Sequence, residues 1–235
     1  MNIFLTGPLR PNIDSFFLNL ENIRKNFPGC QIFLATWKYI EDVVISEMEI
    51  QKLKDAVEYL LILDEPKNDD INDLIKARTR QQSSLPLDHA FNILATYNIY
   101  KMFFAIEKLV EYLEQKKLLK DDDFVVRYRT DLYLDLGVNN ISDINTYYLY
   151  NRDSNNSFDD WFSVSSYNNF KKVWQFKNLK EYETYLSKSW NAEDIIRNKI
   201  LDNKINHSYL DINEAYLIRD PKIWKTDKYM WYKKN

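Results

Sequence analysis

The sequence predicts an α/β protein in which a mostly parallel central sheet is flanked by helices. Short apolar runs of strand length alternate with longer segments of helical periodicity, and this alternation is typical of βα units. With 235 residues, 45% of them hydrophobic, the chain is long enough to bury the core of one domain. We therefore expect a single domain over residues 1–235.

The first part of the chain predicts three strands, because three apolar runs are bounded by Pro-containing turn signals. These runs lie at residues 3–5, 31–36 and 59–63. Between them, apolar side chains recur at helical spacing over residues 14–27 and again up to residue 54. This repeated βα order predicts strands that lie in parallel in one sheet.

The second part of the chain predicts one long helix and then a mixture of strands and helices. Residues 88–117 keep a broad apolar face at helical spacing. Further strands are expected at residues 124–129, 147–150 and 161–164, with a loop at 137–140. Further helices are expected at residues 168–176, 179–187 and 191–202. The C-terminal third is thus the more irregular part of the expected fold.

The composition excludes several classes of protein. Lys and Arg total 32 against 35 Asp and Glu, a net charge of −3, so the chain lacks the basic surface that nucleic-acid binding needs. The 3 glycines lie far apart, which excludes the dinucleotide-binding fingerprint and the P-loop. One Cys and 2 His exclude a disulfide framework and leave little to hold zinc.

Nothing in the sequence predicts export or insertion into a membrane. No basic segment precedes the first apolar residues, so we expect no signal peptide. The most apolar later stretch, residues 91–113, is interrupted by charged side chains and should not span a bilayer. We therefore expect a cytoplasmic protein.

The most informative segment for chemistry is residues 124–131. The two-residue period of a strand places Arg127, Arg129 and Asp131 on one face. An edge strand with a solvated charged face would show the same pattern. The apolar run before the charges favours instead a central strand whose carboxyl end binds a ligand. Arginine matches phosphate geometry and Asp131 could hold Mg²⁺ or Mn²⁺, so we expect a diphosphate ligand.

Five short motifs, in their order and spacing, resemble the WavE-type lipopolysaccharide-synthesis proteins, which are interpreted as glycosyltransferases of the GT-A kind. The motifs are Thr6-Gly7-Pro8-Leu9-Arg10, Ala35-Thr36-Trp37, Arg80-Gln81-Gln82-Ser83-Ser84, Arg127-Tyr128-Arg129-Thr130-Asp131 and Asp159-Asp160-Trp161-Phe162. The resemblance implies a GT-A-like nucleotide-diphospho-sugar transferase fold. It also implies transfer of a sugar from a nucleotide-sugar donor to a surface glycan, either lipopolysaccharide or capsule.

The resemblance also implies a metal site, from which this sequence departs. It places Asp131 where such enzymes carry the last acid of an Asp-x-Asp motif. The first acid of that motif is replaced by Arg129, and the next acid along the chain is Asp135. The usual pair of carboxylates is therefore incomplete. An arginine could instead supply part of the positive charge that stabilises a departing diphosphate.

Other candidate residues each allow two interpretations. Arg10 lies in a loop after the first strand, where it either belongs to a simple turn or reaches a phosphate. Arg80 either faces solvent on a helix or belongs to the donor site. Asp160 either forms a turn with its neighbour or acts as the general base for an acceptor hydroxyl, with Glu193 in reserve. Trp37 either stacks on a ligand or is buried in the core.

These expectations divide the domain into two halves and a tail. Residues 1–135 are expected to bind the nucleotide sugar, and residues 136–220 to face a glycan or lipid-linked glycan acceptor. Residues 221–235 interleave lysines with aromatic side chains, which either contact the inner membrane peripherally or pack their aromatic rings back on the domain. The alternatives are a non-catalytic α/β module for an anionic or nucleotide ligand and, third, a nucleotidyl- or phosphoryl-transferase.

Overall fold

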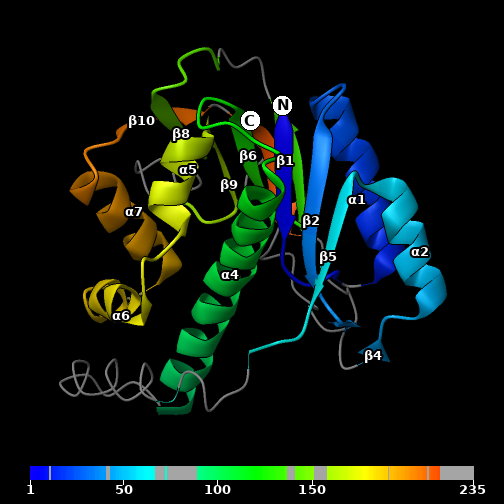
Figure 1. Ribbon diagram of the computed structural model, residues 1–235, viewed down its shortest axis with the longest axis horizontal. Helices are drawn as coiled ribbons and strands as arrows, with labels where there is room; N and C mark the ends of the chain where they lie inside the picture. The colour runs from blue at the N-terminus through cyan, green and yellow to red at the C-terminus, as the bar shows by residue number, and fades with distance from the viewer. Residues whose placement is uncertain are drawn as a thin grey trace.

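A seven-stranded sheet with the order β10-β8-β9-β6-β1-β2-β5 forms the centre of the protein (Figure 1). The computed structural model describes residues 1–10, 12–40, 43–66, 72, 89–136, 141–150, 158–189, 191–210 and 212–217. In sheet order, the strands are β10 (Asn206–Leu210), β8 (Thr146–Tyr150), β9 (Phe162–Ser166), β6 (Phe124–Arg129), β1 (Asn2–Thr6), β2 (Gln31–Trp37) and β5 (Tyr59–Leu63). β9 is antiparallel to both of its neighbours, and the other pairings in this sheet are parallel. The predicted α/β fold with a mostly parallel central sheet is confirmed.

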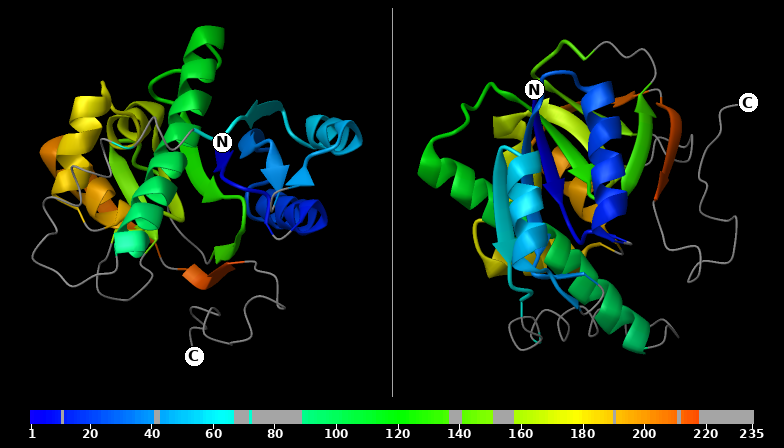
Figure 2. Two further views of the ribbon diagram at one scale, coloured as in Figure 1. Left: turned by 90° about the horizontal axis from the view of Figure 1, so that it is seen from below. Right: turned by 90° about the vertical axis from the view of Figure 1, so that its right-hand side faces the viewer.

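Helices cover both faces of the sheet (Figure 2). On one face lie α1 (Ile13–Asn26) and α2 (Glu47–Ala56), and on the other lie α4 (His89–Lys116), α5 (Tyr167–Trp174), α6 (Leu179–Ser187) and α7 (Ala192–Asp202). The period of two along β1 divides the core accordingly. Ile3 and Leu5 pack with the α1 face, while Phe4 packs with the α4 face, its ring centroid 5.1 Å from that of Phe170. The sheet is therefore buried on both sides.

Residues close in sequence determine where several helices begin. At the start of α1, the side chain of Asn12 accepts a hydrogen bond from the backbone N–H of Ser15. Ser46 and Glu49 form a reciprocal capping box at the start of α2. Such caps satisfy N–H groups that the first helical turn leaves free. This local control explains why the predicted helix bounds agree with the observed ones to within a few residues.

The sequence did not predict β10 or the strands of two small sheets. β7 (Leu132–Leu136) pairs antiparallel with β11 (Ile212–Leu217), and β3 (Tyr39–Ile40) pairs with β4 (Val43–Val44). β7 is short, and its partner lies far along the chain, so no local pattern indicates the pairing. The predicted loop at residues 137–140 lies outside the described residues. Because β7 leaves the main sheet at once, the chain turns sharply directly after β6.

The strand order reverses between β1 and β6. From β1, the chain continues to β2 and β5 on one side of the sheet, whereas β6 pairs on the other side. Thr6 at the end of β1 is in register with Arg129 at the end of β6, so both strands finish at the same level. In open α/β sheets, ligands bind outside the carboxyl ends of the strands at such a reversal.

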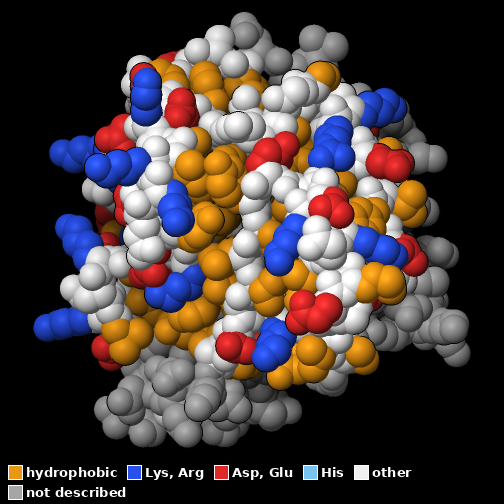
Figure 3. Space-filling view, turned by 45° about the vertical axis from the view of Figure 1, so that its right-hand side comes forward, with side chains coloured by type: hydrophobic (Ala, Val, Ile, Leu, Met, Phe, Trp, Pro, Cys, Tyr) orange, Lys and Arg blue, Asp and Glu red, His pale blue; other side chains and the backbone are white. Residues whose placement is uncertain are grey.

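Charges of both signs are interspersed on the face that Figure 3 shows, over α1, α2 and the neighbouring strands. Among the helices that the structure describes, none combines the length and the apolar character needed to cross a bilayer.

Candidate functional site

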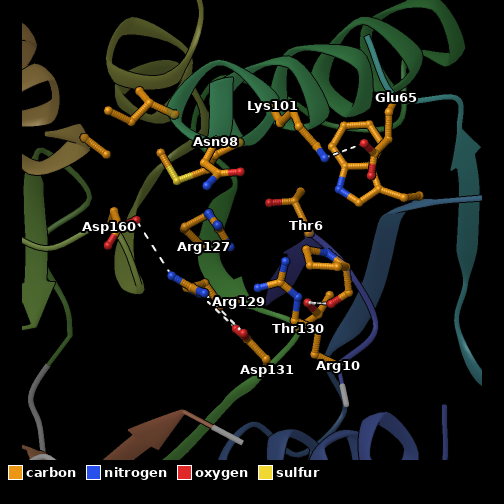
Figure 4. Close-up of a pocket in the computed structure, with 16 residues that line it drawn as sticks. Thr6, Arg10, Glu65, Asn98, Lys101, Arg127, Arg129, Thr130, Asp131 and Asp160 are labelled. Carbon is orange, nitrogen blue, oxygen red and sulfur yellow. Dashed lines mark hydrogen bonds and ion pairs between the residues drawn. The ribbon is translucent and has the colours of Figure 1, made fainter. Parts of the chain in front are cut away.

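A cavity of about 290 Å³ lies at the strand reversal, between the carboxyl ends of β1, β2 and β6 and the side of α4 (Figure 4). The loop after β1 and the turn after β6 form one wall, and α4 forms the opposite wall. Asp160, in the segment that leads into β9, closes one side. The cavity therefore brings together residues from distant parts of the chain.

Arg127 projects from the middle of β6 and is only 1% exposed. Its guanidinium lies over the ring of Trp174, with 5.5 Å between the guanidinium carbon and the ring centroid. Among the described residues, neither Nε nor Nη1 finds a hydrogen-bond partner. Burial and the nearby charge of Arg129 lower the pKa of Arg127 to about 10. The side chain is therefore still a cation at neutral pH, and its Nε and Nη1 groups can donate hydrogen bonds to a ligand.

Arg129 forms a two-pronged ion pair with Asp131. Its Nε donates to Oδ1 of Asp131 at 2.9 Å and its Nη2 donates to Oδ2 at 3.1 Å. The remaining nitrogen, Nη1, lies 3.9 Å from Oδ2 of Asp160. Burial by itself lowers the pKa of Arg129, but these carboxylates outweigh that effect and the net shift is upward. Asp131 and Asp160 thus meet at one guanidinium.

A network of hydrogen bonds fixes the turn that carries Asp131. The hydroxyl of Thr130 donates to the carbonyl of Pro8 at 2.6 Å, and the amide of Asn19 donates to the carbonyl of Thr130 at 3.0 Å. Gly7 adopts a φ of +126°, which only glycine reaches without strain, and a Cβ there would lie 3.4 Å from the Thr130 hydroxyl. The loop after β1 and the turn after β6 are therefore held together as one unit.

The two acids before β9 have different surroundings. Oδ1 of Asp159 accepts a hydrogen bond from the backbone N–H of Trp161, so Asp159 stabilises the local turn. Asp160 instead lines the cavity and is 9% exposed. The alternative of a turn residue thus describes Asp159, while Asp160 faces the space where a ligand would lie.

Two further charged residues, Lys101 on α4 and Glu65 after β5, line the cavity and were not predicted from the sequence. Lys101 forms an ion pair with Glu65, and its ammonium lies 5.5 Å from the ring centroid of Trp37. Trp37 is 3% exposed and stacks on Phe104 with 6.4 Å between ring centroids, so most of its ring belongs to the core. Glu65 follows the end of β5, which is a position that the strand-end rule could have indicated. Lys101 gave no such signal, because a lysine on a helix usually faces solvent.

Of the other residues considered from the sequence, one lines the cavity and the rest do not lie there among the described residues. Arg10 is exposed and lines the cavity from the loop after β1. Arg80 and residues 221–235 lie outside the described residues. Glu193 lies in the first turn of α7, two residues after the N-cap Asn191. Asp135 is an exposed residue of β7, in register with Glu214 of β11.

The residues at the cavity do not fit a divalent cation. In the described part of the chain, no three His, Cys, Asp or Glu side chains lie together in a way that could hold a metal ion. Both oxygens of Asp131, the ligand predicted from the sequence, already accept hydrogen bonds from Arg129. A cation here would have to displace a guanidinium and would then lie beside it.

Comparisons with known proteins show likeness in fold only. No family model matches the chain, and no curated protein matches it. Among solved structures, a nucleoside-diphosphate-sugar pyrophosphorylase from Vibrio cholerae RC9 superposes with a TM-score of 0.51 at 9% identity, over 96% of this chain and 98% of that chain. The galactosyltransferase LgtC, solved with donor and acceptor sugar analogues, gives 0.46 at 12% identity over 89% and 73%. The glycosyltransferase GlyE from Streptococcus pneumoniae TIGR4 gives 0.41 at 10% identity over 88% and 44%.

Proposed function

We propose that this protein is a glycosyltransferase that transfers a sugar from a nucleotide-sugar donor to a surface glycan of the lipopolysaccharide or capsule type. The observation that carries the proposal is the buried guanidinium of Arg127. Two of its nitrogens lack a partner among the described residues, and it lines a cavity at the strand reversal that also contains Asp160. An anionic ligand there would satisfy these N–H groups, and a carboxylate is in place beside it.

In the proposed reaction, the arginines bind the diphosphate and the Asp160 carboxylate acts as the base. The donor diphosphate lies against Arg127 and Arg129, with Arg10 and Arg80 as further contacts. Asp160 takes the proton from the acceptor hydroxyl while the hydroxyl oxygen forms a bond to the anomeric carbon of the sugar. The bond from that carbon to the diphosphate oxygen breaks, and its electron pair leaves with the diphosphate. The arginines stabilise the negative charge that develops there.

The proposal also assigns a side of the cavity to each substrate. Residues 1–135 supply Arg10, Arg127, Arg129 and Asp131, and would hold the nucleotide sugar. Residues 136–220 supply Asp160, and would face a glycan or lipid-linked glycan acceptor. The protein would work in the cytoplasm, with its C-terminal segment near the inner membrane. The short distance between Nη1 of Arg129 and Oδ2 of Asp160, 3.9 Å, supports a meeting point of donor and acceptor at these two side chains.

A second candidate is nucleotidyl transfer. The fold is shared with a protein named as a nucleoside-diphosphate-sugar pyrophosphorylase, over nearly the whole length of both chains. That reaction also needs a cationic site for diphosphate. A third candidate, a binding module without turnover, is compatible with the same buried arginine.

Product analysis separates the three candidates. The full chain is incubated with UDP-, GDP- and CMP-sugars in turn, without an acceptor and then with acceptor glycans, and the products are identified by mass spectrometry. A glycosyltransferase releases nucleoside diphosphate from a UDP- or GDP-sugar, or CMP from a CMP-sugar, together with free or transferred sugar. A pyrophosphorylase forms nucleoside triphosphate only when pyrophosphate is supplied. Saturable binding with no product under any condition would support the binding module and would contradict glycosyl transfer.

A further inference from the structure

The ion pair between Arg129 and Asp131 decides how charge is arranged in the cavity. Asp131 is 1% exposed and accepts both of the hydrogen bonds that the Arg129 fork can donate in parallel. This geometry is the strongest form of arginine–carboxylate pairing. The carboxylate that would be expected to ligate a metal is thereby neutralised from within the chain.

A second ion pair neutralises the far side of the cavity. On the α4 wall, the ammonium of Lys101 is bound by Glu65. Arg127 is different, because the described residues offer no hydrogen-bond partner to its Nε and Nη1. Its guanidinium is packed on Trp174 and 1% exposed, so it cannot turn to bulk water for a partner.

A second buried polar atom lies at the same cavity. The hydroxyl of Thr6, at the end of β1, has no hydrogen-bond partner among the described residues, and Thr6 is 2% exposed. Thr6 and Arg127 both line the cavity and lie near one another in Figure 4. Buried polar groups are nearly always hydrogen-bonded, so donors left over on two neighbouring strands indicate an acceptor from outside the described residues.

We propose that this cavity binds the diphosphate of its ligand without a divalent cation, with Arg127 as the anchoring cation and Arg129 as the positioning residue that neutralises Asp131. The inference rests on the proposed function for the identity of the ligand. A divalent ion would have to remove Arg129 from Asp131 and would leave two guanidinium groups, one of them fully buried, beside a double positive charge. The phosphates instead take the N–H groups of Arg127 directly, since a guanidinium fork matches phosphate oxygens.

Calorimetric titration of the full chain with UDP, GDP and inorganic pyrophosphate tests the proposal. Each titration is run in EDTA, and again with Mg²⁺ or Mn²⁺. We expect at least one of these probes to bind, with a Kd that is the same in EDTA and in either metal. The pyrophosphate arm separates a site for the diphosphate alone from one that also needs the nucleoside. Binding that EDTA abolishes and Mn²⁺ restores would overturn the proposal, and so would the absence of binding in both conditions.

Two variants test the roles of the arginines. Arg127→Met should weaken binding by about 10- to 100-fold, because charged hydrogen bonds are lost. Arg127→Lys should recover part of that loss, and Arg24→Met, at an exposed position of α1, is the matched control. Arg129→Met frees the Asp131 carboxylate, so its binding should become stronger on addition of Mn²⁺. If the Kd of Arg129→Met is the same with and without Mn²⁺, the role given to Arg129 is contradicted.

The outcomes also distinguish this inference from the proposed function. Turnover of a nucleotide sugar that requires Mn²⁺ would support glycosyl transfer and refute cation-independent binding. Cation-independent binding of UDP or GDP without any turnover would support the inference and refute the transferase. The comparison of EDTA with metal uses the unmodified chain, so it decides the question even if a variant fails to fold.

Discussion

Replacing Asp131 by Asn should destabilise the protein as well as impair its activity. From the sequence alone, loss of this carboxylate would be expected to abolish transfer and leave the fold intact. The structure does not support an intact fold, because Asp131 is buried and forms a two-pronged ion pair with Arg129. Asparagine can accept only one of the two hydrogen bonds and leaves the guanidinium without a compensating charge.

The size of the effect follows from the burial of the two partners. Removing one member of a buried ion pair costs about 3–5 kcal/mol. The Asp131 side chain is 2% exposed but that of Arg129 is 21% exposed, so solvent screens part of the charge and the lower limit of about 3 kcal/mol is appropriate. For a domain of this length, each kcal/mol corresponds to about 2–4 °C, which gives a fall in melting temperature of about 6–12 °C.

Thermal unfolding followed by circular dichroism at neutral pH measures this fall. Asp55→Asn is the matched control, because Asp55 is an exposed acid on α2 whose side chain accepts a hydrogen bond from Gln51 one helical turn away. The double variant Arg129→Met/Asp131→Leu removes both charges and should recover much of the loss. A melting temperature of Asp131→Asn within about 2 °C of the wild type would refute the reasoning.

Four further predictions concern Asp160, Gly7, Arg127 and the C-terminal segment. Asp160→Asn should lower turnover by about two to four orders of magnitude if Asp160 is the general base, with little change in melting temperature; equal losses of stability and rate would indicate a structural role instead. Gly7→Ala should cost about 1–3 kcal/mol in urea unfolding, because the φ of +126° is strained for alanine; an unchanged unfolding midpoint would contradict this. Only the protonated form of Arg127 is a cation, and its pKa is lowered to about 10, so calorimetry should show constant diphosphate affinity near neutral pH and a loss as the pH rises through 10. Residues 221–235 should bind anionic vesicles weakly and in a salt-sensitive manner, and truncation after Asp220 should remove this binding; binding that survives truncation would exclude a membrane role for the tail.

Short-range patterns predicted most of the secondary structure. The strand at residues 59–63 and the helix at residues 179–187 have the predicted bounds. The apolar run of the strand and the cap and apolar period of the helix each lie within a few residues. The same logic of alternation identified Arg127 and Arg129 as neighbours on one face of a central strand. It could not reveal β7, β10 or β11, since their pairing partners are specified by tertiary packing rather than by local sequence.

By itself, then, the sequence determined the α/β fold class, the order of the βα units and the strand end at which charged residues collect, since all of these depend on periodicities that repeat within a few residues. Only the tertiary structure decided which charges are paired. Arg129 binds Asp131, whereas Arg127, two residues earlier on the same strand face, packs on Trp174 and lacks partners at Nε and Nη1 among the described residues. The difference depends on which side chains from β1, α4, α5 and the segment before β9 lie close to each guanidinium. The distances from these side chains to the guanidinium groups are set by packing between elements that lie far apart in the chain.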